Sequence, residues 1–299
     1  MRPGSGESHL ARVVSVGRNA AWIAFEDTPE LYVAAFRKSA ERLSLVPGDA
    51  VRATRLDDER AIVDGREPRS FVLERTTAGG RTKTMAANID GIAIVAALAR
   101  PALNFAMIDE LLAFSELYGI GAQLILTKAD LAEAATLASV AALYAPLGYH
   151  VILINPKSGL GIERVSEALA GKRTLLIGQS GVGKSSLFRA LGGTGAVGET
   201  SKSGRGRQTT SAGRLYHVPG GFLIDSPGVG EFEVAGHTPQ AVAQAFLEFR
   251  RPAQACRFRD CTHRTEPGCA VRVAVEDGSV APSRYASYLE ILARHAAAR

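Results

Sequence analysis

The chain has 299 residues, of which 46% are hydrophobic and 22% charged, an ordinary composition for a soluble protein of two or three globular domains. An excess of 35 Lys and Arg over 30 Asp and Glu gives a formal charge of +5, which favours a polyanionic partner without identifying one. The sequence contains no apolar run long enough to span a bilayer and no signal-peptide core in residues 1–10, so we expect a cytoplasmic protein.

Residues 10–63 predict a small β-barrel. The segments ARVVSV, AAWIAFED, LYVAAFR and AVRATRL alternate in polarity and are separated by turn residues, among them Pro47-Gly48-Asp49. The pattern fits an OB-type barrel, which is compatible with oligonucleotide binding, but also an SH3-like barrel or a purely structural module. The stretch TTAGGRTKTMAA, between Arg75 and Ala87, has no apolar period, and we interpret it as a linker.

A different pattern of apolar and polar residues follows this stretch. The apolar segments IDGIAIVAALA, AQLILT, YHVILIN, RTLLIG and GFLID alternate with helical segments, including residues 105–119 and the Ala-rich 132–145. Such alternation predicts a parallel sheet flanked by helices, with ligand bound at the carboxyl ends of its strands.

Two short motifs lie at such strand ends. Thr127-Lys128-Ala129-Asp130 follows AQLIL, and a carboxylate there can accept the ring N–H and the exocyclic amine hydrogen of guanine, a donor pair that adenine lacks. The Lys128 stem can cover the base plane; the alternative is that Asp130 only caps a helix. Asn155-Pro156-Lys157, after VILI, offers backbone contacts to the base and is the weakest signal.

The segment GQSGVGKS, residues 178–185, is a complete phosphate-binding loop between the strand TLLI and the helix SSLFRAL. Its glycines allow backbone N–H groups to surround phosphates at a helix N-terminus. Lys184 is expected to reach the β- and γ-phosphate oxygens, and the Ser185 hydroxyl to bind Mg²⁺. A chance glycine-rich turn is the alternative.

Two further segments predict nucleotide-dependent switches. SKSGRGRQTTS, within the loop 193–212, is too polar and glycine-rich to pack, so we expect a mobile segment that ligand orders, with Thr209 or Thr210 completing the Mg²⁺ shell. A solvated basic loop is the alternative. Asp225-Ser226-Pro227-Gly228 ends the strand GFLI, where Asp225 can hold Mg²⁺ and the Gly228 N–H can sense the γ-phosphate; taken alone it is a turn sequence.

The C-terminal part predicts a helix from Thr238 to Arg250, then a Cys/His-rich knot, then a closing helix from Pro282. Three cysteines and one histidine form the ligand set of a closed tetrahedral Zn²⁺ site: Cys256, Cys261, His263 and Cys269. Reduced, unligated thiols are the alternative.

The same module is rich in arginine, with Arg250, Arg251, Arg257, Arg259 and Arg264. These residues predict a phosphate-contacting surface, and a solvated charged face is the alternative. In the closing helix the pattern places Tyr285, Tyr288, Leu289 and Leu292 inward and Arg284 and Arg294 outward. We do not interpret its tyrosines as a stacking platform.

The motif order resembles the circularly permuted GTPases, because TKAD at 127 precedes the phosphate loop at 178. With the leading barrel, EPRSFVLER, AANID, RGRQTT, DSPG and the C-terminal cysteines, nearly the whole chain is similar to the ribosome small subunit-dependent GTPase A family. The resemblance implies a GTP hydrolase that acts late in small-subunit maturation, binds rRNA, is stimulated by the subunit and leaves on hydrolysis. It also implies GTP/GDP, Mg²⁺ and one structural Zn²⁺, and we expect a monomer without membrane contact.

Three positions depart from what the resemblance leads us to expect. Val229 follows DSPG where many GTPases carry a water-orienting Gln, so intrinsic hydrolysis should be slow. Gln208 replaces the His of the family's RGRHTT text and can orient a water without taking its proton. Thr127 replaces the more usual Asn, which shortens the side chain that tethers the base-reading loop and predicts modest nucleotide affinity.

We therefore predict an OB-fold barrel at residues 1–75, a circularly permuted GTPase domain at 76–235 and a zinc-binding helical module at 236–299. Because DSPG runs directly into that module, γ-phosphate sensing is expected to swing it relative to the barrel. The rival classes are a metabolic ATP kinase, an RNA-binding module with vestigial nucleotide binding, and a GTPase that serves another RNA or a membrane.

The predicted site comprises a catalytic set, a nucleotide-binding set and two metal sets. The catalytic residues are Lys184, Gln208, Thr209, Thr210 and Gly228. The nucleotide-binding residues are Thr127, Lys128, Asp130, Asn155, Pro156, Lys157, Gly178, Gln179, Ser180, Gly181, Val182, Gly183, Lys184, Ser185 and Ser186. The Mg²⁺ ligands are Ser185, Thr209, Thr210 and Asp225, and the Zn²⁺ ligands are the three cysteines and His263.

Overall fold

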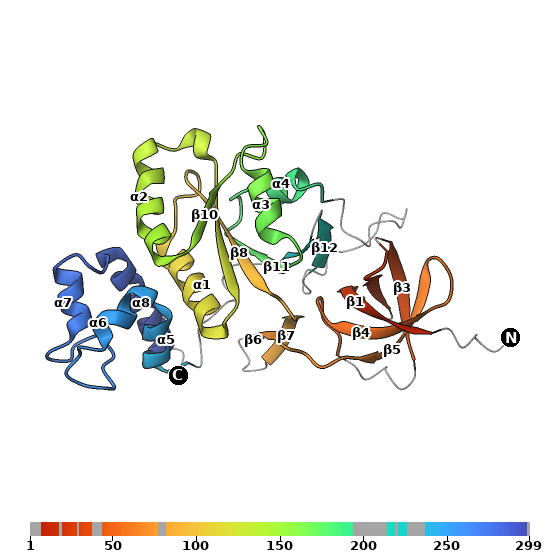
Figure 1. Cartoon of the computed structure of the whole chain (residues 1–299), viewed down its shortest axis with the longest axis horizontal. Coiled ribbons are helices and arrows are strands. Elements are labelled where there is room, and N and C mark those ends of the chain that lie inside the picture. The colour runs from red at the N-terminus through yellow and green to blue at the C-terminus, as the bar shows by residue number, and fades with distance from the viewer. Residues whose placement is uncertain are drawn as a thin grey trace. The chain divides into compact units, whose positions relative to one another are not determined.

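The computed structural model describes residues 7–17, 20–28, 30–37, 44–76, 82–193, 214–218, 221–225 and 237–297 (Figure 1). The chain forms two compact units, each built from segments that are separated in sequence. The first unit comprises residues 1–90, 163–177 and 185–229, and the second comprises 91–162, 178–184 and 230–299. Within the described ranges, no helix is long and apolar enough to cross a membrane.

The N-terminal strands of the first unit close into a barrel, as predicted. β1 (Ser8–Val16), β2 (Ala21–Phe25), β3 (Leu31–Phe36), β4 (Ala50–Arg55) and β5 (Arg60–Arg66) follow the order β1-β2-β3-β5-β4, and β1 pairs with β4 to close it. All pairs are antiparallel except β3 and β5, which are parallel. Alternate side chains, including Val13, Ile23 and Val63, fill its core. The five-stranded closed barrel is the OB-type architecture that the strand pattern favoured.

The predicted linker between Arg75 and Ala87 is instead largely a two-stranded sheet, so that interpretation was wrong for its described residues. β6 (Val72–Thr76) pairs antiparallel with β7 (Thr82–Ala87). Leu73 lies opposite Ala86, and both are buried. Three of the residues in these two strands are threonines, which favour strands without adding an apolar period.

Three more strands belong to the first unit. β11 (Arg173–Ile177) and β13 (Gly221–Asp225) are parallel, and β12 (Arg214–Val218) pairs antiparallel with β13. The sequence pattern predicted β11 and β13 but not β12, a strand of five residues (RLYHV) in which Arg214 and His217 interrupt the apolar positions. Helix α3 (Ile162–Leu169) precedes β11, and helix α4 (Lys184–Ala190) follows it after a short loop.

The second unit contains the expected parallel strands with helices between them. β8 (Gly91–Ala97), β9 (Gly121–Thr127) and β10 (His150–Leu153) pair in the order β10-β9-β8, and every residue of β8 is buried. Helices α1 (Phe105–Tyr118) and α2 (Ala134–Tyr144) connect them, together with the 3₁₀ turns η1 (Ala129–Leu131) and η2 (Ala145–Leu147). Asn104 Oδ1 accepts a hydrogen bond from Met107 N at 3.0 Å and so caps α1.

The C-terminal segment of this unit is helical but more broken than predicted. It comprises α5 (Pro239–Ala245), the 3₁₀ turn η4 (Leu247–Phe249), α6 (Arg250–Ala253), α7 (Ala270–Glu276) and α8 (Pro282–Ala297). The single helix expected from Thr238 to Arg250 breaks at Phe246, whose backbone is extended with ψ 101°. This break buries both Phe246 and Phe249, whose ring centroids stack 5.1 Å apart. Ring burial therefore overrides local helix propensity here.

One prediction for the closing helix α8 is wrong. Tyr288 and Leu292 are buried and Arg294 is exposed, as expected, but Arg284 is only 1% exposed. Its guanidinium donates to Glu248 Oε1 at 2.6 Å and to Asp109 Oδ1 at 2.7 Å. Opposite charges contributed by η4 and α1 therefore allow an arginine to occupy an inward position that sequence periodicity assigned to solvent.

Candidate functional site

The phosphate-binding loop connects β11 to α4, as predicted. A side chain at Gly178 would place its Cβ 2.2 Å from the Val95 carbonyl oxygen, so only glycine fits there. Gly181 and Gly183 have φ values of 78° and 107°, in the region that favours glycine. The glycine spacing therefore sets the path of the loop backbone, which turns into α4 at Lys184.

The TKAD motif lies against this loop. β9 ends at Thr127, whose buried hydroxyl donates to the Val182 carbonyl at 2.5 Å. The next residue, Lys128, has a left-handed backbone (φ 57°), and its ammonium donates to the Gly181 carbonyl at 2.8 Å and to the Arg100 carbonyl. Two motifs separated by some 50 sequence positions are thereby in direct contact within one unit.

Asp130 and the Asn155 segment lie near the same strand ends. Asp130 is exposed in η1, directly after β9. Ile154 N donates to the Leu126 carbonyl at 2.8 Å, so the chain leaving β10 runs beside the end of β9. Asn155 Oδ1 then accepts from Lys157 N at 3.0 Å, which fixes the turn at Pro156. The carboxyl ends of two adjacent parallel strands thus bring these predicted base contacts to one edge.

The cationic and hydroxyl groups of the phosphate loop lie at its C-terminal end. Lys184 Nζ donates to the carbonyls of Gly178 and Gln179 at 2.6 and 2.9 Å, so its charge is held over the loop backbone. Ser180 and Ser185 are exposed, and Ser186 is half-buried. Asp225 is the last residue of β13, as predicted. The remaining predicted switch residues lie outside the described ranges: Gln208, Thr209, Thr210 and Gly228, with Val229 beside them.

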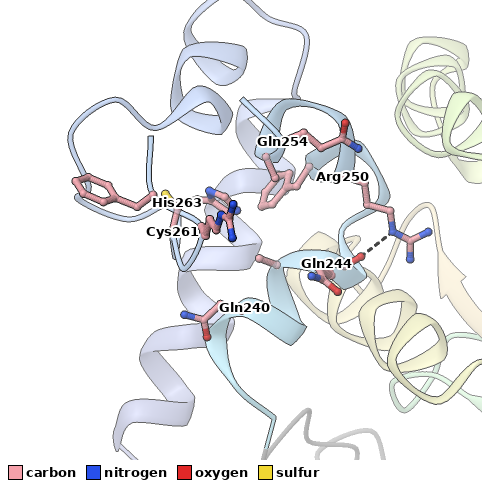
Figure 2. Close-up of a pocket in the computed structure, with 11 residues that line it drawn as sticks. Gln240, Gln244, Arg250, Gln254, Cys261 and His263 are labelled. Carbon is pink, nitrogen blue, oxygen red and sulfur yellow. Dashed lines mark hydrogen bonds between the residues drawn. The ribbon is translucent and has the colours of Figure 1, made fainter. Parts of the chain in front are cut away.

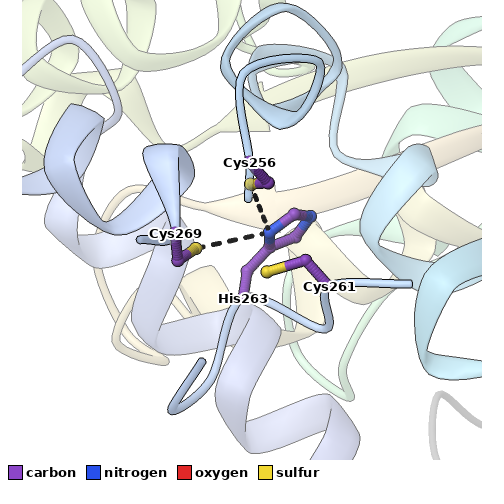
Figure 3. A group of neighbouring side chains, drawn as sticks. All are labelled: Cys256, Cys261, His263 and Cys269. Carbon is purple, nitrogen blue, oxygen red and sulfur yellow. Dashed lines mark hydrogen bonds between the residues drawn. The ribbon is translucent and has the colours of Figure 1, made fainter. Parts of the chain in front are cut away.

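The four predicted zinc ligands come together in the C-terminal module (Figure 3). Their ligand atoms all lie within 4.8 Å of one another, and Cys261, His263 and Cys269 are buried. His263 Nδ1 lies 3.6 Å from Cys256 Sγ and 3.5 Å from Cys269 Sγ. A tetrahedral zinc with ordinary Zn–S and Zn–N bonds would separate these atoms by about 3.6 Å. The residues therefore fit a tetrahedral zinc through Nδ1.

The protonation of this cluster also fits a cation. Burial raises the pKa of the Cys261 thiol to about 12 and lowers the pKa of His263. The Cys261 thiol and the His263 imidazole are therefore neutral by themselves, and a thiolate at Cys261 requires a compensating positive charge. Four protein ligands leave no open position, which is the arrangement of structural rather than catalytic zinc.

Comparisons with known proteins agree with this architecture. Residues 66–235 match the family model described as RsgA GTPase. The chain is 42% identical over 260 residues to the small ribosomal subunit biogenesis GTPase RsgA 1 of Vibrio vulnificus, which is 83% of this chain and 74% of that protein. The chain belongs to the RsgA GTPase family.

Solved structures extend the likeness of this RsgA-family chain to nearly its full length. The crystal structure of YjeQ from Thermotoga maritima, 28% identical, superposes with a TM-score of 0.78 over 97% of this chain and 99% of that chain. YloQ, described as a circularly permuted GTPase and 24% identical, has a TM-score of 0.77 and covers 98% of this chain and 96% of its own. The second likeness establishes the fold, including the permuted order that the motifs indicated.

Sequence reasoning missed several groups that hold the zinc module of this RsgA-family chain in shape. The hydroxyls of Tyr285 and Tyr288 donate to the carbonyls of His263 and Thr262 at 2.7 and 2.5 Å. Burial opposes ionisation of Glu266, yet hydrogen bonds from Thr262 and nearby backbone N–H groups lower its pKa to about 2. Glu266 lies three residues from both His263 and Cys269, and this spacing was the sequence signal that could have identified it.

Proposed function

We propose that the chain is a GTP hydrolase that acts late in maturation of the small ribosomal subunit, binds its rRNA, and is released when the subunit stimulates hydrolysis. The observation that carries the nucleotide part is the hydrogen bond from Thr127 to the Val182 carbonyl, because it joins a guanine-reading motif to a phosphate-binding loop. The ribosomal part is supported by the name of the Vibrio vulnificus relative.

In this proposal the exposed Asp130 accepts hydrogen bonds from guanine, and the Lys128 stem covers the base. The backbone of Asn155, Pro156 and Lys157 borders the base on the neighbouring strand end. The loop from Gly178 to Ser186 wraps the phosphates with its N–H groups at the start of α4. Thr127 replaces the longer Asn, but its hydroxyl still reaches the loop, so the tether is intact.

Hydrolysis then proceeds by in-line attack of water on the γ-phosphate. Lys184 and the loop N–H groups stabilise the charge that develops on the phosphate oxygens, while the Gly228 N–H senses the γ-phosphate. A magnesium ion held by Ser185, Asp225 and either Thr209 or Thr210 would neutralise charge between the β- and γ-phosphates. Gln208 orients the attacking water, since Val229 carries no polar group.

The other two parts are proposed to contact RNA. The barrel offers an OB-type surface, and the zinc-bearing module presents exposed arginines at 251, 257, 259 and 264. Zinc in this module is structural. The barrel domain is proposed to end at residue 75, and the GTPase domain to extend from 76 to 235.

Multiple-turnover phosphate release tests the proposal. GTP turnover should be slow for the isolated chain, faster with small subunits, and unchanged with large subunits. Equal rates under all three conditions would remove the ribosomal part, and no turnover under any of them would favour an RNA-binding module with vestigial nucleotide binding.

Gln208 offers a sharper test of the mechanism. Gln208→Ala should lower subunit-stimulated turnover by about 10²-fold or more, because a water-positioning group acts in the transition state, while GDP affinity stays nearly unchanged. Stimulated turnover at the unsubstituted rate would end the water-positioning role of Gln208.

A further inference from the structure

A cavity of about 480 Å³ lies in the C-terminal module, and two of the four predicted zinc ligands are among the residues that line it (Figure 2). Gln240 and Gln244 of α5 and Arg250 of α6 line one side, and Cys261 and His263 line the other. This volume lies within the range of small-ligand sites. A single nucleobase can therefore enter it.

Two arginines line the cavity, and one of them already has a carboxylate partner. Arg250 pairs with Glu116 Oε2 at 2.9 Å and donates through Nε to the Gln244 carbonyl at 2.9 Å. Arg259 has no carboxylate partner within the described part of the chain, so it supplies the available positive charge. The neighbouring Asp260 contributes its backbone carbonyl, which accepts from Gln240 Nε2 at 3.0 Å. Such a lining favours an anionic ligand, for which a phosphate is suited to arginine.

An exposed aromatic ring borders the same cavity. Phe258 lines it and is 40% exposed, with the Arg257 guanidinium 5.5 Å from its ring centroid. Backbone hydrogen bonds from Cys261 N to the Phe258 carbonyl and from Arg257 N to the Gly268 carbonyl fix this segment on both sides. The Cys/His-rich segment therefore holds the apolar Phe258 ring partly exposed to solvent, where the ring can stack on a planar ligand.

Two amide side chains complete the set. Gln244 and Gln254 line the cavity and are exposed, and neither side chain has a hydrogen-bond partner within the part of the chain that the structure describes. Each amide offers one acceptor and two donors, which matches the mixed edges of nucleobases. An acidic peptide would use the arginines but would leave the ring and both amides without counterparts.

We propose that this cavity binds one unpaired nucleotide of RNA, with its base stacked on Phe258, its edge bonded to Gln244 and Gln254, and its phosphate near Arg259. A base within a duplex cannot enter, since it is already stacked and paired. The inference rests on the proposed function only in taking RNA as the partner, and it adds a base-accepting site to a surface otherwise argued from charge.

Fluorescence anisotropy of the full zinc-loaded chain with a labelled single-stranded RNA of about eight nucleotides tests this site without ribosomes or GTP. Phe258→Ala should weaken binding about 5- to 150-fold, which corresponds to the loss of one stacked base. Binding to a duplex of the same sequence should change less than about twofold. Val273→Ala, which truncates another exposed apolar residue of the module, should leave both affinities unchanged.

A second variant keeps the test independent of folding. Phe258→Trp in a Trp22→Phe chain leaves one tryptophan at the cavity, since Trp22 is the sole tryptophan of the sequence. Its fluorescence should be quenched on addition of the single-stranded RNA, with zinc content unchanged at one ion per chain. Absence of quenching at saturation overturns the proposal. The proposal is also overturned if Phe258→Ala weakens binding of single-stranded RNA, duplex RNA and polyglutamate equally, because this result would indicate a surface that binds anions non-specifically. Loss of ribosome-stimulated GTP turnover alone would bear on the proposed function and not on this site.

Discussion

Replacing the buried Arg284 by methionine should destabilise the second unit strongly. Arg284 lies in α8 and donates to Asp109 of α1 at 2.7 Å and to both carboxylate oxygens of Glu248 at 2.6 and 3.1 Å. Its guanidinium also lies 4.7 Å from the Phe246 ring centroid. Arg284→Met keeps the apolar stem but leaves two carboxylates near each other without their cation.

The expected loss is about 4 kcal/mol, because breaking a buried ion pair by removing one partner costs about 3–5 kcal/mol. In a unit of roughly 150–250 residues, 1 kcal/mol shifts the midpoint by about 2–4 °C, so the loss corresponds to a decrease of roughly 8–16 °C. Arg294→Met is a matched control in the same helix, since Arg294 is half-exposed and pairs with Glu110 at 2.9 Å. Its loss should be smaller than that of Arg284→Met, because the Arg294 guanidinium is solvated although its partner Glu110 is buried.

The loss should also depend on pH. Burial raises the pKa of Asp109 even with Arg284 beside it, and removing Arg284 should raise it further. A carboxyl with a raised folded-state pKa contributes stability at low pH that is lost as pH rises through that pKa. Arg284→Met should therefore be less destabilised at mildly acidic pH than at neutral pH.

Scanning calorimetry of the unsubstituted chain, Arg284→Met and Arg294→Met at both pH values provides the measurement. Adding Asp109→Asn to Arg284→Met should restore part of the lost stability, because it removes one uncompensated charge while keeping an acceptor for the Tyr144 hydroxyl. Equal losses for Arg284→Met and Arg294→Met, or no recovery in the double variant, would refute the assigned role of the buried charges.

Three shorter predictions concern the nucleotide and metal sites. Thr127→Ala should weaken GDP binding about tenfold in a fluorescence titration, because the buried Val182 carbonyl loses its hydrogen-bond donor. A Thr127→Asn variant that binds GDP no more tightly than Thr127→Ala would contradict the role of residue 127 as a tether to the loop. Asp130→Asn should shift the preference from GTP toward xanthosine triphosphate in competition binding, and unchanged GTP selectivity would contradict the assignment of Asp130 to the base. Cys269→Ser should lower zinc content in metal analysis and increase hydrogen exchange across residues 239–297; full retention of both zinc and protection would argue against a structural metal.

Local sequence signals predicted the parts of the molecule whose geometry is encoded locally. Gly178 is required by its approach to Val95, and the loop around it follows a strand and precedes a helix, so spacing alone located it. The TKAD motif was placed correctly because a strand end is marked by the transition from apolar to polar residues. The zinc cluster followed from ligand types close together in sequence, whose separation limits how far apart they can fold.

Features that depend on distant partners were not predictable in this way. Arg284 was assigned to solvent because no local pattern identifies Asp109, 175 positions earlier, as its partner. The helix from Thr238 breaks at Phe246 because two rings enter the core there, a choice made by tertiary packing. In the β6–β7 pair the apolar residues are contiguous, at 72–73 and 85–87, so they produce no alternating pattern.

Helix α1 gives the permuted chain a physical link between the TKAD motif and the C-terminal module. Three of its acidic residues pair with three arginines of that module: Asp109 with Arg284, Glu110 with Arg294 and Glu116 with Arg250. The helix begins shortly after Arg100, whose carbonyl accepts from Lys128 of TKAD.

A swing of the module by itself, as expected from the junction after Gly228, would have to separate the buried Asp109 from Arg284, a change costing several kcal/mol. Movement of the module together with α1 keeps that pair intact. Nucleotide-dependent motion of the C-terminal module should therefore include α1, and hydrogen exchange in residues 105–118 should change with the bound nucleotide in parallel with residues 282–297. A change confined to the C-terminal residues would show that the ion pairs do not transmit the motion.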